Sequence, residues 1–275
     1  MPELPEVETV RRGLEPHLLN QFFLTARIID PRLKISISSD LPEKLAHFQI
    51  TEIKRRGKYL LFKCQKNQQI IHLLIHLGMT GSLRVLPQHT PLQPHVCIDF
   101  LLENGQLLRY TDPRRFGVIV LIDGDPLQHK LLAHFGPEPF EESFNTEYFY
   151  QQLKRRRVPI KNLIMENQIV VGVGNIYASE SLFHAGILPT RLGVSISFEE
   201  AEKLREEIIS TLNKALEQGG TTIRNFTNAE GNAGYFKQFL YVYGRNDQPC
   251  HHCKTLIQHI TQGQRSTYFC PNCQK

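Results

Sequence analysis

Residues 250–273, CHHCKTLIQHITQGQRSTYFCPNC, determine how the C-terminal end of this 275-residue chain folds. They hold four of the six cysteines as two pairs, Cys250 with Cys253 and Cys270 with Cys273. Each pair can present two thiolates from a tight turn, and two such pairs make a tetrahedral zinc site with no position open for water or substrate. We therefore expect one structural Zn²⁺, with two disulfides as the alternative.

The residues between the two cysteine pairs form a predicted hairpin of two short strands around Gly263 and Gln264. A hairpin of this size has too little core to fold alone, so zinc would supply the folding free energy. The turn would then display Arg265, a candidate phosphate contact, although a single exposed arginine is more often ordinary surface. His251 and His252 are competing ligands that we expect to be solvated.

The preceding part of the chain has helical periodicity. Ser197 and Glu200 form a capping box, and Gly219 provides a stop signal. One apolar face is marked by Phe198, Ala201, Leu204, Ile208, Leu212 and Ala215. Residues 148–153, 160–165 and 176–184 are further predicted helices, so a helical domain is expected here.

The sequence of the first half of the chain predicts one opening helix, over residues 5–19, followed by strands. The predicted strands are residues 22–29, 59–64, 70–75, 96–102, 107–110 and 118–122. Asn104-Gly105 marks a hairpin between two of them. The absence of alternating helices favours an antiparallel sandwich or barrel.

The sequence thus predicts an α+β fold in two domains. Residues 1–134 would form an N-terminal antiparallel β-sandwich domain, and residues 135–147 (containing FGPEPFEES) a linker. Residues 148–244 would form the helical domain, and residues 245–275 the four-cysteine hairpin.

Charge is unevenly distributed along the chain. The formal net charge is +5, all of it in residues 151–275, which suggests an anionic partner. The basic run of residues 154–157 precedes Gly172, Gly174 and Asn175, a plausible phosphate loop at a helix start. A dinucleotide fingerprint is excluded because Tyr177 occupies the third glycine position. Apolar stretches are too short to cross a membrane, no secretory signal is present, and the sparse cysteines fit a reducing, cytoplasmic setting.

Two loop-like segments carry exposed-looking apolar residues. HLGMTG (76–81) presents Met79, and DPRRFG (112–117) presents Arg114 and Phe116. An apolar side chain on a loop tip can enter a base stack while arginine neutralises the backbone. Ordinary core packing is the alternative for Met79 and Phe116.

The N-terminus carries a candidate nucleophile. Removal of Met1 would leave Pro2 with a free secondary amine, and an α-amino group has a pKa of about 7.7 to 8.0. Attack on a sugar C1′ would give a cationic iminium, and Glu3 could supply the proton. The simpler alternative is that these residues only begin a helix.

Together these motifs resemble the bacterial formamidopyrimidine-DNA glycosylase (MutM) family over the whole chain. The resemblance is carried by PELPEVETVRRGLEPHL at residues 2–18, RRGKYL at 55–60, HLGMTGSLR at 76–84, YTDPRRFG at 110–117, VVGVGNIYASESLFHAGI at 170–187 and the cysteine motif. It implies a helix-two-turn-helix domain and a bifunctional glycosylase and lyase. Such an enzyme removes 8-oxoguanine and formamidopyrimidines from duplex DNA, then cleaves the abasic site by β,δ-elimination.

The resemblance also assigns roles to individual residues. The implied catalytic residues are Pro2 as Schiff-base nucleophile, Glu3 as proton donor, Lys58 for β-elimination and Arg265 for δ-elimination. The implied DNA contacts are Met79, His95, Arg114, Phe116, Arg156 and Asn175, and the implied zinc ligands are Cys250, Cys253, Cys270 and Cys273. Residues 221–235 would fold over the flipped base. Lys254 departs from the family, which usually has glycine there.

Three interpretations remain. The first is the purine-specific enzyme, acting as a monomer on double-stranded DNA. An endonuclease VIII-like enzyme for oxidised pyrimidines would share the fold and the nucleophile. A non-enzymatic zinc-ribbon DNA-binding protein would explain the cysteines and the basic half, but it gives no reason for a free Pro2 beside Glu3.

Overall fold

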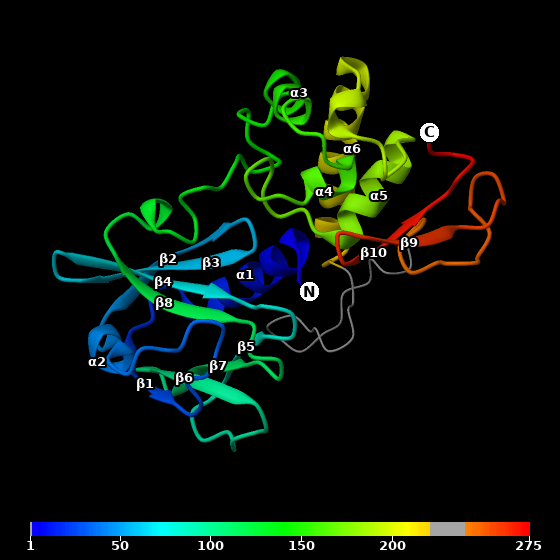
Figure 1. The fold of residues 1–275 in the computed structure, drawn as a ribbon. Helices are drawn as coiled ribbons and strands as arrows, with labels where there is room; N and C mark the ends of the chain where they lie inside the picture. Colours follow the sequence, from blue (N-terminus) through cyan, green and yellow to red (C-terminus); the bar gives the residue numbers. More distant parts are fainter. Residues whose placement is uncertain (1, 221–239) are drawn as a thin grey trace. The chain divides into compact units, whose positions relative to one another are not determined.

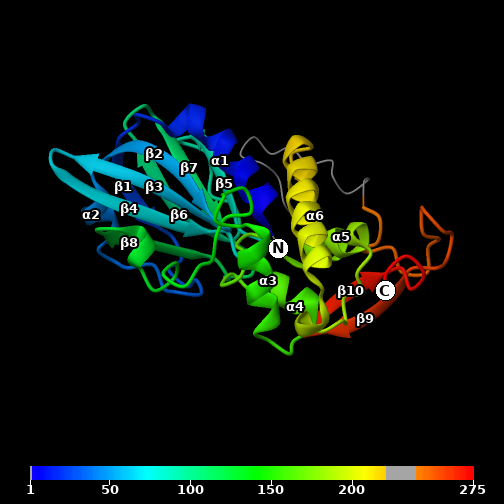
Figure 2. The same ribbon diagram turned by 90° about the horizontal axis from the view of Figure 1, so that it is seen from above.

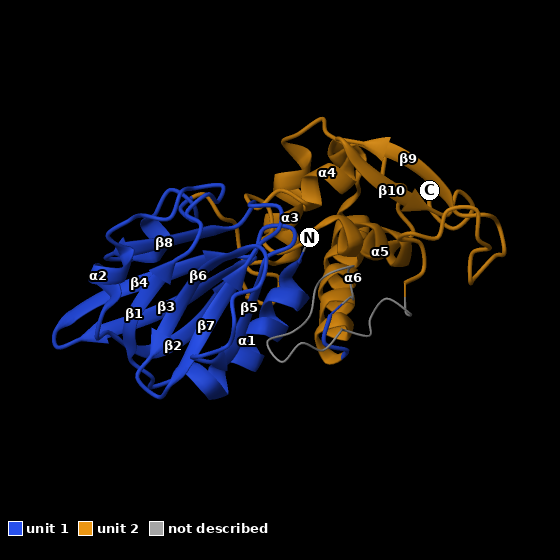
Figure 3. Cartoon of the chain, turned by 90° about the horizontal axis from the view of Figure 1, so that it is seen from below, with its two compact units in different colours: residues 1–133, 218–235 blue, residues 134–217, 236–275 orange. Residues whose placement is uncertain are grey.

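The computed structural model describes residues 2–220 and 240–275, which divide into two compact units (Figure 3). Unit 1 contains residues up to Ala133 and the short segment after residue 217. Unit 2 contains His134–Glu217 and the C-terminal residues from 240 onward. The loop of residues 221–235 lies outside the described residues.

Unit 1 is an antiparallel sandwich of two four-stranded sheets (Figure 1). Its helices are α1 (Leu4–Leu18) and α2 (Leu41–Leu45), followed after the sheets by a 3-10 turn, η1 (Pro126–Gln128). Its strands are β1 (Phe23–Ile28), β2 (Gln49–Arg56), β3 (Tyr59–Lys66), β4 (Gln69–His76), β5 (Ser82–Pro87), β6 (Val96–Leu102), β7 (Gln106–Thr111) and β8 (Val118–Asp123).

One sheet has the order β1-β6-β7-β5 and the other β2-β3-β4-β8, and their inner faces share one core. The core contains Phe23 and Phe100 from the first sheet and Phe62 and Leu73 from the second, each 0 % exposed. β6 and β7 form the predicted Asn104-Gly105 hairpin, with Gly105 at a positive φ of 79°. That register places Asp99 directly opposite Arg109.

Helix α1 packs against β2, β3 and β5 with one apolar face (Figure 2). Val7, Val10, Leu14 and Leu18 recur at helical spacing on that face, and all are buried in the unit 1 core. The helix begins one residue before the predicted start, with Pro5 in its first turn, where a missing N–H costs no hydrogen bond.

Unit 2 is helical and ends in a two-stranded hairpin. It contains α3 (Thr146–Lys154), α4 (Ile160–Ile164), α5 (Asn175–Ala185), the 3-10 turn η2 (Gly193–Ser195), α6 (Phe198–Glu217), β9 (Gln258–Gln262) and β10 (Arg265–Phe269). At the start of α6, the Ser197 N–H donates to Glu200 Oε2 (2.9 Å) and the Glu200 N–H to Ser197 Oγ (3.2 Å). The predicted capping box is thereby confirmed.

The predicted α+β class, β-sandwich, helical unit and terminal hairpin are confirmed, but three elements were missed. β2 and β5 lie at sheet edges, where one side of the strand is not paired and polar residues interrupt the apolar alternation. α2 has only five residues, too few to show a helical period. Among the described residues, no helix is long and apolar enough to cross a membrane.

Candidate active site and metal centre

The N-terminal residues of unit 1 bring two carboxyl groups to the start of α1. Pro2 is buried, and Glu3 and Glu6 are only 2 % and 0 % exposed. The Glu3 N–H donates to Glu6 Oε2 at 2.7 Å, and the two residues form a capping box. The sequence therefore places an acid and the positive end of a helix dipole beside Pro2.

Lys58 lies in the tight turn between β2 and β3, next to Gly57 at φ 57°. Arg55 braces this turn, because it donates to the Gly57 carbonyl (3.0 Å) and to Glu8 Oε2 on α1 (3.2 Å). Lys58 also influences His76 at the end of β4. The pKa of His76 is lowered to about 4, mainly by burial and secondly by the positive charge of Lys58. That imidazole is therefore neutral at pH 7, as its Nδ1 acceptor role toward the Gly78 N–H (3.0 Å) also requires.

The two loops that carry Met79 and Phe116 are fastened together by Asp112, which is 0 % exposed. Its carboxylate accepts hydrogen bonds from Thr80 Oγ1 (2.6 Å) on one loop and from the N–H groups of Gly117 (2.8 Å) and Arg114 (3.2 Å) on the other. Several donors on one buried carboxylate fix both loops in a single arrangement.

Glycines allow these loops to approach so closely. A Cβ on Gly117 would lie 1.7 Å from the Tyr110 hydroxyl, and one on Gly81 would lie 2.2 Å from the Leu77 carbonyl oxygen. Gly78 has φ 64°, and a Cβ there would meet the Gly117 nitrogen at 2.6 Å. Side chains at these positions would push the loops apart.

The loops display the side chains that the sequence singled out. Met79 is 38 % exposed and Phe116 is 45 % exposed, which argues against ordinary core packing for either residue. The Arg114 guanidinium lies over the Phe116 ring, 5.0 Å from its centroid. The structure thus brings Met79, Arg114 and Phe116 onto two joined loops.

His95 lies beside the same pair of loops. It is exposed and adopts φ 69°, and its carbonyl accepts the Asp112 N–H at 3.1 Å. Unit 1 therefore contains Pro2, Glu3, Lys58 and the four residues of this loop region, whereas Arg156, Asn175 and Arg265 belong to unit 2.

In unit 2, Asn175 begins α5 directly after Gly174 and is tied to the terminal hairpin. Its Nδ2 donates to the Ser266 carbonyl (2.9 Å). The Lys161 ammonium, only 1 % exposed, donates to Asn175 Oδ1 (2.5 Å) and to Thr267 Oγ1 (2.7 Å). The glycine loop and the hairpin are thus one hydrogen-bonded assembly, and Arg265 is exposed at the hairpin's turn.

Arg156 is engaged within unit 2. Its guanidinium pairs with Glu166 and donates to Gln168 Oε1 (3.1 Å). Its neighbours Arg155 and Arg157 are exposed. Of the three arginines in the basic run, these two present the more accessible charges.

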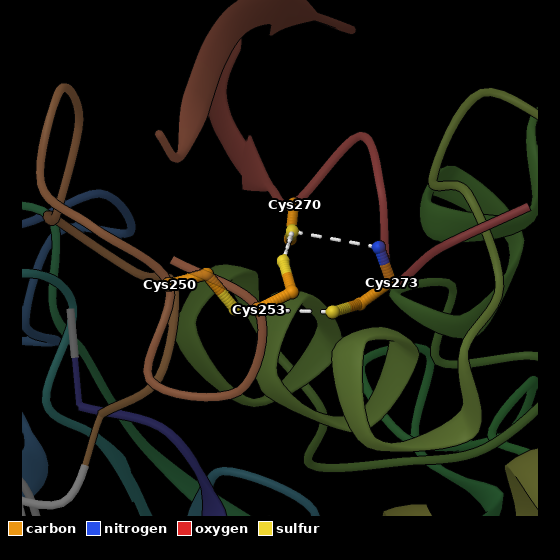
Figure 4. A group of neighbouring side chains, drawn as sticks. All are labelled: Cys250, Cys253, Cys270 and Cys273. Atoms are coloured by element: carbon orange, nitrogen blue, oxygen red, sulfur yellow. Dashed lines mark hydrogen bonds between the residues drawn. The ribbon is translucent and has the colours of Figure 1, made fainter. Parts of the chain in front are cut away.

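The four predicted zinc ligands come together at the base of the hairpin (Figure 4). The Cys250 and Cys273 sulfurs lie 3.9 Å apart and those of Cys253 and Cys270 3.4 Å apart. Thiolates bound tetrahedrally at about 2.3 Å from zinc lie about 3.8 Å from one another, so this set fits the ion. It is the only cluster of metal-ligating side chains among the described residues, and its four thiolates fit a structural zinc ion.

The surroundings of the cluster shift the pKa values of its thiols in opposite directions, and hydrogen bonds with Thr255 and Asn272 lower the pKa of Cys253. Burial, and then hydrogen bonding with the neighbouring cysteines, raises the pKa of Cys273 well above its usual value. A divalent ion would reverse that effect and stabilise the thiolates. His251 and His252 are exposed, as expected, although both rings lie beside Tyr241, with centroids 5.6 and 5.4 Å away.

The hairpin is supported by unit 2 as well as by its cysteines. Cys250, Ile257 and Cys270 share a small apolar cluster with Phe183 of α5 and with Val242. Gln274, 1 % exposed, accepts the Cys270 N–H (2.8 Å) and donates to the Ile187 carbonyl (2.8 Å). These contacts between the hairpin and the helical part of unit 2 could not be predicted from the sequence, because the contacting residues are far apart along the chain.

Comparisons with known proteins cover almost the whole chain. Residues 1–119 match the formamidopyrimidine-DNA glycosylase N-terminal domain, and residues 135–227 match the formamidopyrimidine-DNA glycosylase H2TH domain. Residues 247–275 match a zinc finger found in FPG and IleRS. The helix-two-turn-helix and zinc-finger assignments are thereby confirmed.

Individual relatives give the same result. A formamidopyrimidine-DNA glycosylase of Hydrogenovibrio crunogenus is 50 % identical over all of this chain and 97 % of its own. Lactococcus lactis Fpg in complex with DNA containing an abasic site has a TM-score of 0.90 at 34 % identity, covering 99 % of both chains. MutM in complex with DNA containing carbocyclic 8-oxo-G has a TM-score of 0.91 at 35 % identity, covering 100 % of both chains.

Proposed function

Because the chain belongs to the formamidopyrimidine-DNA glycosylase family of DNA-repair enzymes, we propose that it excises oxidised purines from duplex DNA and then cleaves the abasic site. The substrates are 8-oxoguanine and formamidopyrimidines. Solved relatives bind DNA with an abasic site, Fapy-dG or carbocyclic 8-oxo-G, which supports this substrate class.

The observation that carries the proposal is the arrangement of Pro2, Glu3 and Glu6 at the start of α1. Removal of Met1 gives Pro2 a secondary amine, and the positive end of the helix favours its neutral, nucleophilic form. The capping box satisfies both buried carboxyl groups as part of the helix start, and it also holds them in a fixed place beside Pro2. They suit a site that moves protons.

The chemistry follows from these groups. The Pro2 nitrogen attacks C1′ of the damaged nucleotide and the bond from C1′ to the base breaks. The nitrogen loses its N–H proton, and the base leaves with that proton. Glu3 donates a proton to the ring oxygen O4′, the sugar ring opens, and Pro2 and C1′ share an iminium bond. The iminium withdraws electrons and acidifies the C2′ hydrogen.

Strand cleavage uses two further residues. Lys58 assists β-elimination, in which C2′ loses a proton and the 3′ phosphate leaves. Arg265 contacts phosphate and assists δ-elimination, in which the 5′ phosphate leaves. The tight turn around Lys58 and the exposed position of Arg265 at the hairpin support these roles, because both cations are held on rigid elements.

Binding uses the displayed loops and the basic half of the chain. Met79, Arg114 and Phe116 fill the space that the extruded base leaves in the duplex. His95 and Asn175 contact phosphates. Arg156 does so as well if its pairing with Glu166 opens, and the exposed Arg155 and Arg157 lie next to it.

We also propose a separate function for each domain of the chain. Residues 1–134 form the catalytic domain, residues 148–244 the helix-two-turn-helix DNA-binding domain, and residues 245–275 the zinc finger, with residues 135–147 as linker. The enzyme acts as a monomer in the cytoplasm.

A lesion panel tests the proposal. Duplexes carrying 8-oxoguanine opposite cytosine, thymine glycol or undamaged guanine are incubated with the zinc-loaded protein, and released base and cleaved strand are both measured. We expect base release and β,δ-cleavage with 8-oxoguanine. Preferential excision of thymine glycol would support the pyrimidine enzyme, and tight binding without excision would support a DNA-binding protein.

A further inference from the structure

Residues 88–95, which join β5 to β6 in unit 1 and end at His95, form a loop that has little packing of its own. Pro91, Leu92, Gln93, Pro94 and His95 are all exposed, Leu92 by 52 %. An exposed loop without an apolar anchor loses little by moving. His95, at the end of this loop, therefore needs contacts from outside the loop to keep its position.

A buried arginine provides that means. Arg109 on β7 is 3 % exposed, and it donates from Nη1 to the Pro91 carbonyl (2.8 Å) and from Nη2 to the Thr90 carbonyl (3.2 Å). The same guanidinium makes a bidentate pair with Asp99, with distances of 2.7 Å from Nε and 2.9 Å from Nη2. One side of the group is thus bound to the sheet and the other to the loop.

The pairing with Asp99 is what allows a charged group to lie there. Asp99 is 0 % exposed and faces Arg109 across the β6-β7 ladder. Burial tends to raise the pKa of Asp99, but hydrogen bonds from Arg109 and Arg27 bring it below the usual value. Only a planar guanidinium can hold a carboxylate bidentately and still donate to two carbonyls.

The other end of the loop is fixed independently. The His95 carbonyl accepts the Asp112 N–H at 3.1 Å, and His95 itself adopts a left-handed φ of 69°, which is uncommon for a residue other than glycine. The loop is therefore held at Thr90 and Pro91 by Arg109 of β7, and at His95 by the N–H of Asp112, the residue after β7.

We propose that the Arg109–Asp99 pair is a positioning device that holds residues 88–95 so that His95 is presented to the DNA backbone. The inference rests on the proposed function, in which His95 contacts a phosphate. Arg109 touches no DNA in this scheme and acts through the loop alone.

A double-mutant cycle tests the proposal on the full-length, zinc-loaded protein. Arg109→Lys keeps the charge beside Asp99 but cannot also reach both carbonyls. It is compared with His95→Ala and with the double variant. Arg27→Met is the matched control, because it removes another donor to Asp99 (2.8 Å), and this donor is an exposed side chain on β1 and not the group that holds the loop carbonyls.

We expect Arg109→Lys to weaken binding to a duplex with an abasic-site analogue by about tenfold, the loss of one charge-assisted hydrogen bond. His95→Ala should weaken it equally, and the double variant no further. In Arg27→Met, DNA affinity and excision at saturating enzyme should stay at wild-type values, although the thermal midpoint falls because Asp99 loses one donor. In Arg109→Lys, amide hydrogen exchange should become faster in residues 88–95 and stay unchanged in β6 and β7. This measurement needs no DNA, and it reports on the loop even if the variant is less stable.

Additive losses from Arg109→Lys and His95→Ala, or unchanged exchange in residues 88–95, would overturn the inference. These outcomes differ from failure of the proposed function, in which the wild-type protein itself neither binds nor excises the lesion.

Discussion

At the scale of single residues, Lys254 shows how a backbone conformation constrains a side chain. It follows Cys253 in the zinc finger and adopts φ 68°, and its N–H donates to the Cys250 carbonyl (3.1 Å). The left-handed region costs an L-residue roughly 1–2 kcal/mol and costs glycine little. The resemblance to the glycosylase family predicts glycine at this position, and the conformation explains that preference.

Replacing Lys254 by glycine should therefore stabilise the zinc finger. We expect Lys254→Gly to raise the free energy of unfolding by about 1 kcal/mol, because the strain disappears while some unfolded-state entropy is gained. The measurement is thermal or denaturant unfolding of the zinc-loaded protein. His251→Gly, in the same turn but outside the left-handed residues, is the control and should not stabilise. A lower stability for Lys254→Gly would show that the lysine side chain contributes more than its backbone costs.

Some site residues could be predicted from the sequence and others could not. The cysteines, Met79 and Phe116 stand out because their type or spacing is unusual. Asp99 and Arg109 were missed because a two-residue turn at Asn104-Gly105 would place Asp99 opposite Tyr110, whereas the observed register is shifted by one residue and places it opposite Arg109. Lys161 was hidden for a different reason: its partners Asn175 and Thr267 are far along the chain.

At the scale of elements, the two loops that carry Met79 and Phe116 behave as one unit because Asp112 binds both. Their close approach depends on Gly117, whose absent side chain leaves room for the Tyr110 hydroxyl. The hydroxyl lies 3.4 Å from both the His76 carbonyl and Asp112 Oδ2, and either of them can accept its single proton. The exposed positions of Met79 and Phe116 therefore depend on the close packing of the Gly117 backbone against the Tyr110 hydroxyl.

Gly117→Ala should disrupt this packing. We expect a loss of about 1–3 kcal/mol in unfolding free energy, the usual cost of overpacking, and a clear fall in excision rate. Gly105→Ala is the control: it has φ 79° but no atom within 4 Å of the added Cβ, so it should cost about 1 kcal/mol and leave excision intact. Equal excision by Gly117→Ala and the wild type would show that the loops tolerate separation.

Strand prediction succeeded for every central strand and for the edge strands β1 and β8, and it failed for the edge strands β2 and β5, where polar residues interrupt the apolar pattern. β3, β4 and β6 are apolar runs that the sequence identifies directly, because both neighbours cover them. β2, QITEIKRR, mixes charges with apolar residues because it is an edge strand. Its charges include Arg55, which supports the turn of Lys58.

At the scale of the whole molecule, charge and chemistry are divided between the two halves of the chain. The net +5 lies in residues 151–275, with the basic run, Asn175, Arg265 and the zinc finger, whereas residues 1–150 are neutral overall and hold Pro2, Glu3 and Lys58. Phosphate binding would then be strongly salt-dependent and would depend on the zinc finger.

Removing zinc should abolish tight DNA binding and spare unit 1. The hairpin β9-β10 has only a small apolar cluster, so loss of the metal should unfold it and release Arg265 from its fixed place. Binding is measured by fluorescence anisotropy after chelation, with zinc added back as the control. Unit 1 has its own core and should keep its hydrogen-exchange protection. Wild-type affinity in the metal-free protein would contradict this role.

In the proposed mechanism Pro2 forms a covalent bond with C1′, and borohydride reduction in the presence of an 8-oxoguanine duplex traps that bond. Borohydride reduces an iminium to a stable amine, so denaturing electrophoresis should show a protein–DNA adduct for the wild type and for Arg27→Met. The adduct should be lost in Pro2→Gly and in protein that retains Met1. No adduct from correctly processed protein, or an undiminished adduct when Met1 is retained, would contradict the account.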